Sequence, residues 1–178
     1  MTTYKEYLTQ AMNLLAEVEN SIFLGQSVRY PGTGMFSTLT SVLESKLLEL
    51  PVFENTQLGI STGLSLVGLL PISIFPRMNF LICALDQLVL HLDAIPRYSD
   101  GGYRPKVIIR TMVAHDQPLN PGEQHLGDYS LALTHMLRTV QVVRLKHPRG
   151  IVPAYREALE HDGSTILVEY AALYDEVG

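Results

Sequence analysis

The chain alternates between stretches in which apolar residues recur at helical spacing and short stretches that are apolar throughout. Leu8, Met12, Leu15 and Val18 lie three or four positions apart, which predicts an amphipathic first helix. Further helices are predicted at 41–50, from residue 54 onward, and at 79–95, 128–138 and 149–161. Short apolar runs, typical of strands, occupy residues 21–28, 71–75, 106–113, 140–145 and 165–170.

The order of these elements predicts the fold class. Apolar strands that alternate with helices are typical of a parallel sheet covered by helices on both faces. The length of 178 residues suits one domain, and no linker divides the chain. The sequence therefore predicts a single α/β domain over residues 1–178, with a doubly wound, mostly parallel sheet as the middle of three layers.

Composition narrows the class of function. Hydrophobic residues make up 47% of the chain and charged residues only 17%, which favours a buried interface with another chain. The net charge of −5 includes no basic cluster, so nucleic acid is not an expected partner. Apolar runs are interrupted well before membrane-spanning length, so no membrane partner is expected either.

The cysteine content and the first residues indicate a compartment. A single cysteine, Cys83, excludes a disulfide framework and favours a reducing environment. The chain opens on polar residues rather than on the apolar stretch of a signal peptide. We therefore expect a cytoplasmic protein.

Glu54 is the first candidate for chemistry, because it stands at the start of an apolar helix that contains glycines. An acidic residue there is usually a cap that suits the helix dipole. A carboxyl group in a poorly hydrated cleft, however, favours its protonated form, which a proton-sharing group needs near neutral pH. Gly59 and Gly63 each cost roughly 1 kcal/mol of helix propensity. A close contact with a subunit or a cofactor would explain that cost.

Two other chemistries find little support. Residues 59–63 match the G-x-S-x-G nucleophile elbow, but that motif needs a strand that enters a sharp turn. Ser61 instead lies inside a helical pattern, which argues against a serine hydrolase. A metal site is conceivable on residue type alone, but the spacing fits no ligand motif for His115, Asp116, Glu123, His125 and Asp128.

In their order, these residues resemble the pyrimidine-binding domain of thiamine diphosphate enzymes, in particular the beta subunits of 2-oxoacid dehydrogenases. That family has a Glu, then glycines along a helix, then a Pro before an apolar strand, and the matching residues are Glu54, Gly59, Gly63, Gly68 and Pro71. Two later blocks match in the same order: Ala-Leu-Asp-Gln at 84–87 and Gly-Glu-Gln-His at 122–125. The resemblance covers about residues 4–174.

The resemblance implies a thiamine diphosphate site in which Glu54 is the central residue. In the family, a protonated glutamic acid hydrogen-bonds nitrogen N1′ of the pyrimidine ring and so activates the cofactor. Glu54 matches that residue, and His125 matches a histidine on the substrate side of the cofactor. These two residues are the implied catalytic residues.

Three further residues are implied to bind the cofactor, and two of them depart from the family. Met78 stands where the family has an aromatic residue against the aminopyrimidine, although a methionine can also lie against a ring. Gln26 stands where the family has an acid, which removes a charge from the floor of the cleft. Phe75 begins the same turn as Met78, and a place in the core is its alternative.

The resemblance also implies a partner chain. Family members bind the diphosphate through Mg²⁺ and a Gly-Asp-Gly motif on another domain, and this motif is absent from the sequence. The chain ends near the point where the beta subunits begin their carboxy-terminal domain. We therefore expect a pyrimidine domain that shares the cofactor with an alpha-like chain, which holds the Mg²⁺. The expected assembly is a homodimer or a heterotetramer.

Three readings of the function remain open. The first is a catalytic subunit of 2-oxoacid dehydrogenase or transketolase type, inactive without its partner. The second is a non-catalytic assembly or regulatory protein that keeps the fold and the interface. Gln26 and Met78 favour the second, whereas Glu54 and His125 favour the first. The third is an unrelated α/β ligand-binding module.

Overall fold

The computed structural model describes residues 1–117 and 120–178. In these residues, six parallel strands form one sheet in the order β2-β1-β3-β4-β6-β5. The strands are β1 (Ser21–Gly25), β2 (Leu47–Glu49), β3 (Leu70–Phe75), β4 (Ile108–Val113), β5 (Gln141–Arg144) and β6 (Thr165–Tyr170). The helices are α1 (Tyr4–Ala16), α2 (Glu54–Leu66), α3 (Met78–Ile82), a π-helix (Gln87–Leu92), α4 (Ile95–Tyr98), α5 (Ser130–Met136) and α6 (Ile151–Glu160).

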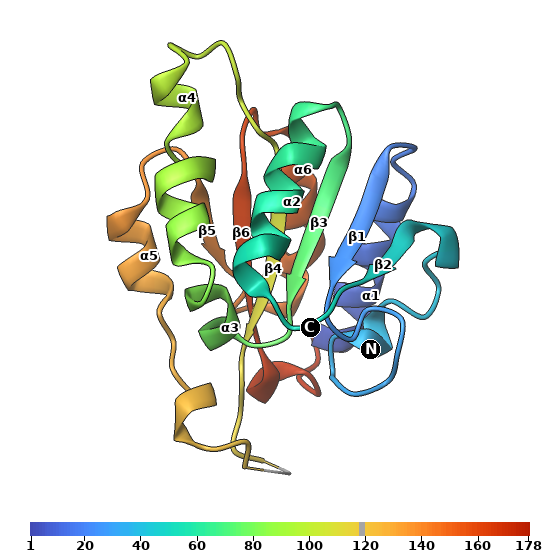
Figure 1. Ribbon diagram of the computed structural model, residues 1–178. Coiled ribbons are helices and arrows are strands. Elements are labelled where there is room, and N and C mark those ends of the chain that lie inside the picture. The colour runs from blue at the N-terminus through green and yellow to red at the C-terminus, as the bar shows by residue number, and fades with distance from the viewer. Residues whose placement is uncertain (118–119) are drawn as a thin grey trace.

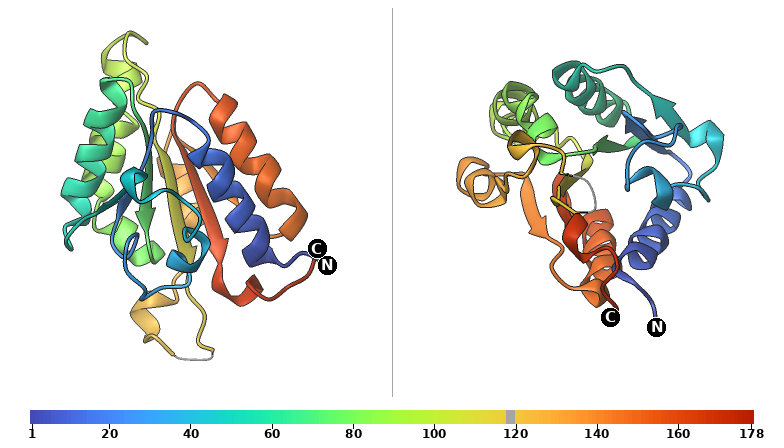
Figure 2. Two further views of the ribbon diagram at one scale, coloured as in Figure 1. Left: turned by 90° about the vertical axis from the view of Figure 1, so that its right-hand side faces the viewer. Right: turned by 90° about the horizontal axis from the view of Figure 1, so that it is seen from below.

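Helices cover both faces of the sheet, which confirms the predicted three-layer α/β fold. Helices α1 and α6 pack on one face, and α2, the π-helix and α5 pack on the other (Figure 1, Figure 2). In β4, Ile108 and Met112 belong to the core under α1 and α6, whereas Ile109 and Val113 belong to the core under α2. Because successive side chains of a strand point to opposite faces, a strand covered on both sides is apolar throughout.

An ion pair between Arg110 of β4 and Glu169 of β6 is enclosed in this core, with both side chains fully buried. Arg110 Nε donates to Glu169 Oε1 at 2.8 Å and Nη2 donates to Oε2 at 3.0 Å. Arg110 also donates to the hydroxyl of Thr38, and the hydroxyl of Tyr174 donates to Glu169. Burial lowers the pKa of Arg110, but the charge of Glu169 outweighs this and raises it above its usual value. The pair therefore joins two strands, the loop after β1 and the carboxy-terminal segment.

The prediction of a helix at residues 41–50 is wrong. This segment forms a short 3₁₀ turn, Glu44–Lys46, and then the edge strand β2, which pairs with β1. Leu47 packs against the core while Leu48 points outward, and this alternation is the period of a strand. A short apolar run is compatible with the period of a helix and with that of a strand. Whether this segment forms a helix or a strand therefore depends on its pairing with β1 rather than on its own pattern.

The long helix predicted at 79–95 is interrupted. Helix α3 ends at Ile82, the π-helix begins at Gln87, and the chain continues past Pro96 into the short helix α4. Pro96 lies in the first turn of α4 and does not end the preceding helix. A proline is tolerated there because the first backbone N–H groups of a helix have no intrahelical acceptor.

Asp93 connects the end of the π-helix to the start of β5. Asp93 is 1% exposed, and its Oδ1 accepts hydrogen bonds from the backbone N–H groups of Arg138, Thr139 and Val140 at 2.7–3.0 Å. Burial by itself raises the pKa of Asp93, but these donors outweigh it and hold the pKa below its usual value. The ionised carboxylate therefore stabilises the folded chain.

We predict that Asp93→Asn destabilises the protein at pH 7 by about 1–3 kcal/mol, because the backbone donors lose a charged acceptor. The native contribution is fully present above the unfolded pKa of about 3.9 and declines as the pH falls from there through the lower folded pKa. Urea unfolding at several pH values should show the stability difference from the natural protein shrinking below about pH 4. The exposed Asp100→Asn serves as the control, and an equal loss at every pH would contradict this account.

Candidate functional site

The predicted site residues lie at or shortly after the carboxyl ends of the strands, in strand ends, connecting turns or the first residues of helices. Gln26 follows β1, Glu54 begins α2 after β2, and Met78 follows β3. His125 lies in a 3₁₀ turn, Glu123–His125, in the connection from β4 to α5. Since the strands are parallel, their carboxyl ends all lie on the same side of the sheet. The segments that follow them therefore gather at the lower end of the molecule in Figure 1. Ligands of open α/β sheets bind at this edge.

Glu54 is buried, with an exposed fraction of 9%. It is the first residue of α2, and the preceding residue, Phe53, provides no side-chain cap. The side-chain amide of Gln26 donates to Glu54 Oε1 at 3.2 Å. Among the described residues, no donor is bonded to Oε2. The carboxyl group thus has one oxygen held by the protein and one that can bond to a ligand.

Gln26 reaches Glu54 because the chain turns sharply at the end of β1. Gly25 has φ +153°, and a side chain at this position would collide with the carbonyl oxygen of Ile74 in the neighbouring strand. Glycine alone accepts both the backbone conformation and the close approach. Gly25 therefore permits the turn that positions Gln26.

Phe75 and Met78 are both fully buried. Phe75 lies in the core under α2, and the sulfur of Met78 accepts a hydrogen bond from the backbone N–H of Tyr129 at 3.3 Å. Neither side chain is open to a ligand in this conformation. Their role as cofactor contacts stays a prediction, and it requires these side chains to move.

His125 is held by two residues of α3 that the sequence interpretation did not include in the site. Its Nδ1 lies 3.0 Å from Asn79 Oδ1, and its ring meets the ring of Phe80 edge-on at 5.5 Å. Because an amide oxygen can only accept, this contact places the proton on Nδ1, and in residues 1–117 and 120–178 no hydrogen bond occupies Nε2, which can accept one. Partial burial, and then the charge of Arg77, lower the pKa of His125 below its usual value. The imidazole is therefore neutral at pH 7.

Asn79 and Phe80 carried a signal that was available in the sequence. They follow Met78 directly, at the start of a predicted helix, and both are partly exposed at the edge that holds the other candidates. Phe80 is partly buried and also packs against the core under α2. Its contact with His125, 45 residues away in the sequence, depends on the connection after β4 and could not be read from local pattern.

The glycines of α2 have different roles. A side chain at Gly59 would press on Gln87, so this glycine serves packing within the chain. Gly68 lies beyond the helix, and its φ of +92° is the conformation that commonly ends a helix. Gly63 is exposed, and a Cβ there would meet nothing within 4 Å. Only Gly63 therefore leaves an open notch on the outer face of α2.

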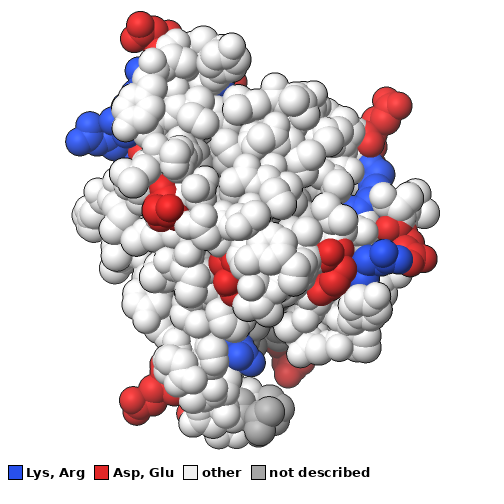
Figure 3. Space-filling view, viewed as in Figure 1, with Lys and Arg blue, Asp and Glu red and all other residues white. Residues whose placement is uncertain are grey.

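The outer face of α2 is uncharged, because the buried Glu54 is the only charged residue of this helix. Its exposed or partly exposed residues include Asn55, Thr56, Ile60, Gly63 and Leu66. The space-filling view shows a broad uncharged area over this helix (Figure 3). Depletion of charge is a property of the centre of protein interfaces.

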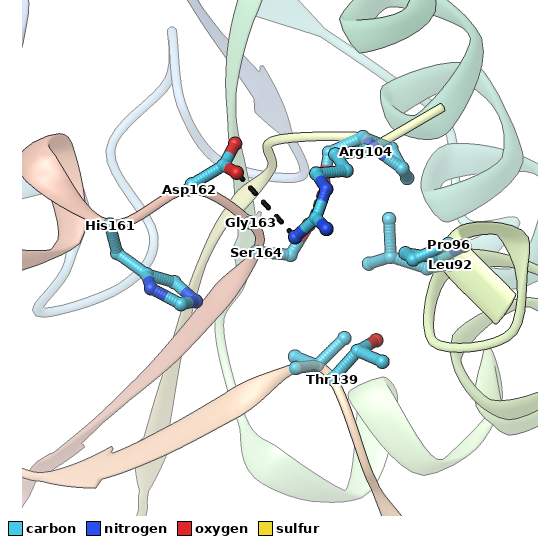
Figure 4. A pocket seen from close by; sticks show the side chains of 10 residues that line it. Leu92, Pro96, Arg104, Thr139, His161, Asp162, Gly163 and Ser164 are labelled. Atoms are coloured by element: carbon cyan, nitrogen blue, oxygen red, sulfur yellow. Dashed lines mark hydrogen bonds and ion pairs between the residues drawn. The ribbon is translucent and has the colours of Figure 1, made fainter. Parts of the chain in front are cut away.

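A cavity of about 230 Å³ lies at the opposite ends of the strands from Glu54 (Figure 4). Its wall includes the ion pair Arg104–Asp162, with 3.5 Å between Nη1 and Oδ2, and the imidazole of His161. Ser164, directly before β6, places this cavity at the amino-terminal ends of the strands. It is therefore not part of the site around Glu54.

The described residues contain neither a cluster of metal ligands nor a membrane-spanning helix. No three histidine, cysteine, aspartate or glutamate side chains in residues 1–117 and 120–178 come together as a metal site, so the five metal candidates of the sequence do not form one. In the same residues, no helix has both the length and the apolar character needed to cross a bilayer.

Comparison with known proteins relates the chain to one group. No family model matches it. It is 25% identical over 177 residues to the pyruvate dehydrogenase E1 component subunit beta of Gracilaria tenuistipitata var. liui, which is 94% of this chain and 52% of the relative. The same protein of Mycoplasma genitalium is also 25% identical over 177 residues, with shares of 95% and 52%. That of Chaetosphaeridium globosum is 26% identical over 133 residues, with shares of 73% and 39%. The chain thus spans about half the length of these relatives or less.

A solved structure has the same fold. The chain matches a structure described as split gene transketolase, inactive beta4 tetramer, with a TM-score of 0.74 and 18% identity. The match covers 99% of this chain and 53% of that one. The resemblance is therefore confirmed: the chain is a homologue of pyruvate dehydrogenase E1 beta subunits and has a transketolase-like α/β fold.

Proposed function

We propose that this chain is the pyrimidine-domain subunit of a thiamine diphosphate-dependent enzyme of 2-oxoacid dehydrogenase or transketolase type. The observation that supports it most directly is the buried carboxyl group of Glu54, one oxygen of which is held by Gln26 while the other is free. A ring nitrogen of a pyrimidine is a suitable partner for that free oxygen. The residues present therefore fit this part of the cofactor.

Each residue has a defined task in this proposal. Glu54 shares a proton with the pyrimidine ring through Oε2, and Gln26 keeps the carboxyl group oriented. When bound, thiamine diphosphate would supply the stabilisation of negative charge on carbon, which side chains cannot provide. His125, neutral and with Nε2 free, accepts or holds a proton on the substrate side.

Phe80 is the better candidate for the aromatic contact in this proposal. Met78 is buried, whereas Phe80 is partly exposed and already stands against His125. Aromatic rings pack edge-on or offset against other rings. A heteroaromatic ring that binds beside His125 would find Phe80 without rearrangement of the core.

The partner proposed for this chain is an alpha-like protein that holds the diphosphate and the Mg²⁺. The uncharged outer face of α2, with its notch at Gly63, is a suitable interface because a backbone can approach a glycine closely. The relatives matched here are described as beta subunits, which fits a role in a larger assembly.

A non-catalytic assembly or regulatory protein is the second candidate. The burial of Met78 favours it, because the turn after β3 then offers no side chain at that position to a cofactor. Calorimetry of thiamine diphosphate with Mg²⁺, with and without a co-purified partner, separates the two. Heat of binding that appears only with the partner supports the catalytic role. A stable complex that binds no cofactor supports the assembly role.

We predict that Glu54→Gln lowers turnover of the reconstituted complex by about 10²-fold or more, because an amide cannot exchange a proton with the ring. Folding should be unchanged, since glutamine has the same shape and the bond from Gln26 can still be accepted. The control is Glu44→Gln at an exposed position of the loop before β2. Full activity of the Glu54 variant would rule out the assigned role.

We predict opposite effects of Gly63→Ala on stability and on assembly. Alanine should stabilise the isolated chain by about 1 kcal/mol, because it favours the helix and meets nothing within 4 Å. The same methyl group should weaken binding to the partner, because it fills the notch at the interface. Denaturant unfolding and sedimentation of the complex measure the two effects.

Gly150→Ala is the matched control, since a Cβ there also meets nothing within 4 Å and Gly150 precedes α6 on the opposite face of the sheet. It should leave assembly unchanged. Normal assembly of the Gly63 variant would show that the partner does not dock on the outer face of α2.

A further inference from the structure

The turn after β1 is held by a single carboxylate. Glu49 Oε1 accepts the backbone N–H of Ser27 at 2.6 Å, and Oε2 accepts those of Val28 and Arg29, each at 2.8 Å. Three consecutive N–H groups thus converge on one side chain. Hydrogen bonds to an ionised acceptor are about twice as strong as neutral ones.

Glu49 is well placed for this contact because of the sheet. It is the last residue of β2, and in the parallel pairing of β1 and β2 it stands directly opposite Gly25. The backbone N–H of Leu50 donates to the carbonyl oxygen of Gly25 at 2.8 Å. The sheet therefore fixes the base of the side chain, and the three N–H groups fix its end.

Gln26 lies between two residues with positive φ. Gly25 has φ +153° and Ser27 has φ +55°. A residue other than glycine pays a conformational cost in the left-handed region, so Ser27 needs compensating contacts. The carboxylate of Glu49, bonded to Ser27 itself and to the next two residues, supplies them.

The side chain of Gln26 leads from this turn to the candidate site. Its amide nitrogen donates to Glu54 Oε1 at 3.2 Å, and no other side-chain hydrogen bond of Gln26 occurs in the described residues. The direction of this side chain is thus set by the backbone of the turn. Glu49 itself makes no contact with Glu54 among these hydrogen bonds.

We propose that Glu49 is a positioning residue of the site: its carboxylate fixes the turn that aims the Gln26 amide at Glu54. Its effect on catalysis rests on the proposed function, whereas the positioning of Gln26 does not. Sequence pattern gave no sign of this role, because Glu49 stood in a segment predicted to be helical.

The test must separate positioning from a general contribution to stability. A purely structural Glu49 would lower stability without a specific change at Glu54. A positioning Glu49 acts through Gln26, so its effect at Glu54 must vanish once Gln26 is removed. Non-additivity of this kind is what a double-mutant cycle measures.

The experiment uses the full chain at pH 7, with the ¹³C signal of the Glu54 side-chain carboxyl as the reporter of its hydrogen bond. We expect Gln26→Ala and Glu49→Ala to move this signal in the same direction. The double variant should show the shift of Gln26→Ala alone. Glu49→Gln keeps the shape but loses one acceptor oxygen, so it should give a smaller shift, and it decides the matter if Glu49→Ala does not fold.

Glu44→Ala is the matched control, because Glu44 lies in the 3₁₀ turn directly before β2 and its carboxylate pairs with the side chain of Arg29 instead of the backbone. It should leave the Glu54 signal in place. The proposal is overturned if both Glu49 variants leave the signal unmoved, or if their shift adds to that of Gln26→Ala. It is equally overturned if Gln26→Ala has no effect.

A second measurement links the result to function. In the complex reconstituted with the diphosphate-holding partner, Glu49→Ala should weaken thiamine diphosphate binding by up to about tenfold, and by no further amount in a Gln26→Ala background. If the NMR shifts occur but the complex binds no thiamine diphosphate, the positioning role stands and the proposed function fails. An additive loss of affinity would overturn the positioning role.

Discussion

All strands of the described sheet run in the same direction, and the arrangement of the candidate site depends on this constraint. Parallel strands need a crossover after each one, and every crossover starts at the same edge. Gln26, Glu54, Met78 and His125 come from four different crossovers, so their gathering at one edge follows from strand direction alone. Local interactions then determine which side chains face a ligand: the bond from Gln26 holds Glu54, and the burial of Met78 withdraws it.

Some parts of the fold could be predicted from the sequence, among them the strand at 165–170 and the start of a helix at Glu54. The strand segment is short and rich in β-branched residues, and these features favour a strand where periodicity alone does not decide. The segment at 41–50 was wrong because an edge strand of three residues, Leu47–Glu49, takes its conformation from pairing with β1. Such pairing is a tertiary contact and leaves no local signature.

The sequence predicted which segments form the site but not which contacts they make. The order of the motifs along the chain pointed to Glu54 and His125, and the proteins that share this order are among the homologues. Order could not show that Phe80 rather than Met78 is open beside His125, because both lie within one turn of the same helix and differ only in the face they present. Whether Glu49 bonds to the backbone of residues 27–29 likewise depends on the β1–β2 register.

The buried pair of Arg110 and Glu169 has a consequence for how this sequence can change over time. Loss of either member alone leaves an uncompensated charge in the core, at a cost of about 3–5 kcal/mol, comparable with the entire stability of many domains. Replacement of both by apolar residues of similar volume is often tolerated. We therefore expect substitutions at positions 110 and 169 to be coupled: a change of one residue is tolerated only together with a change of the other.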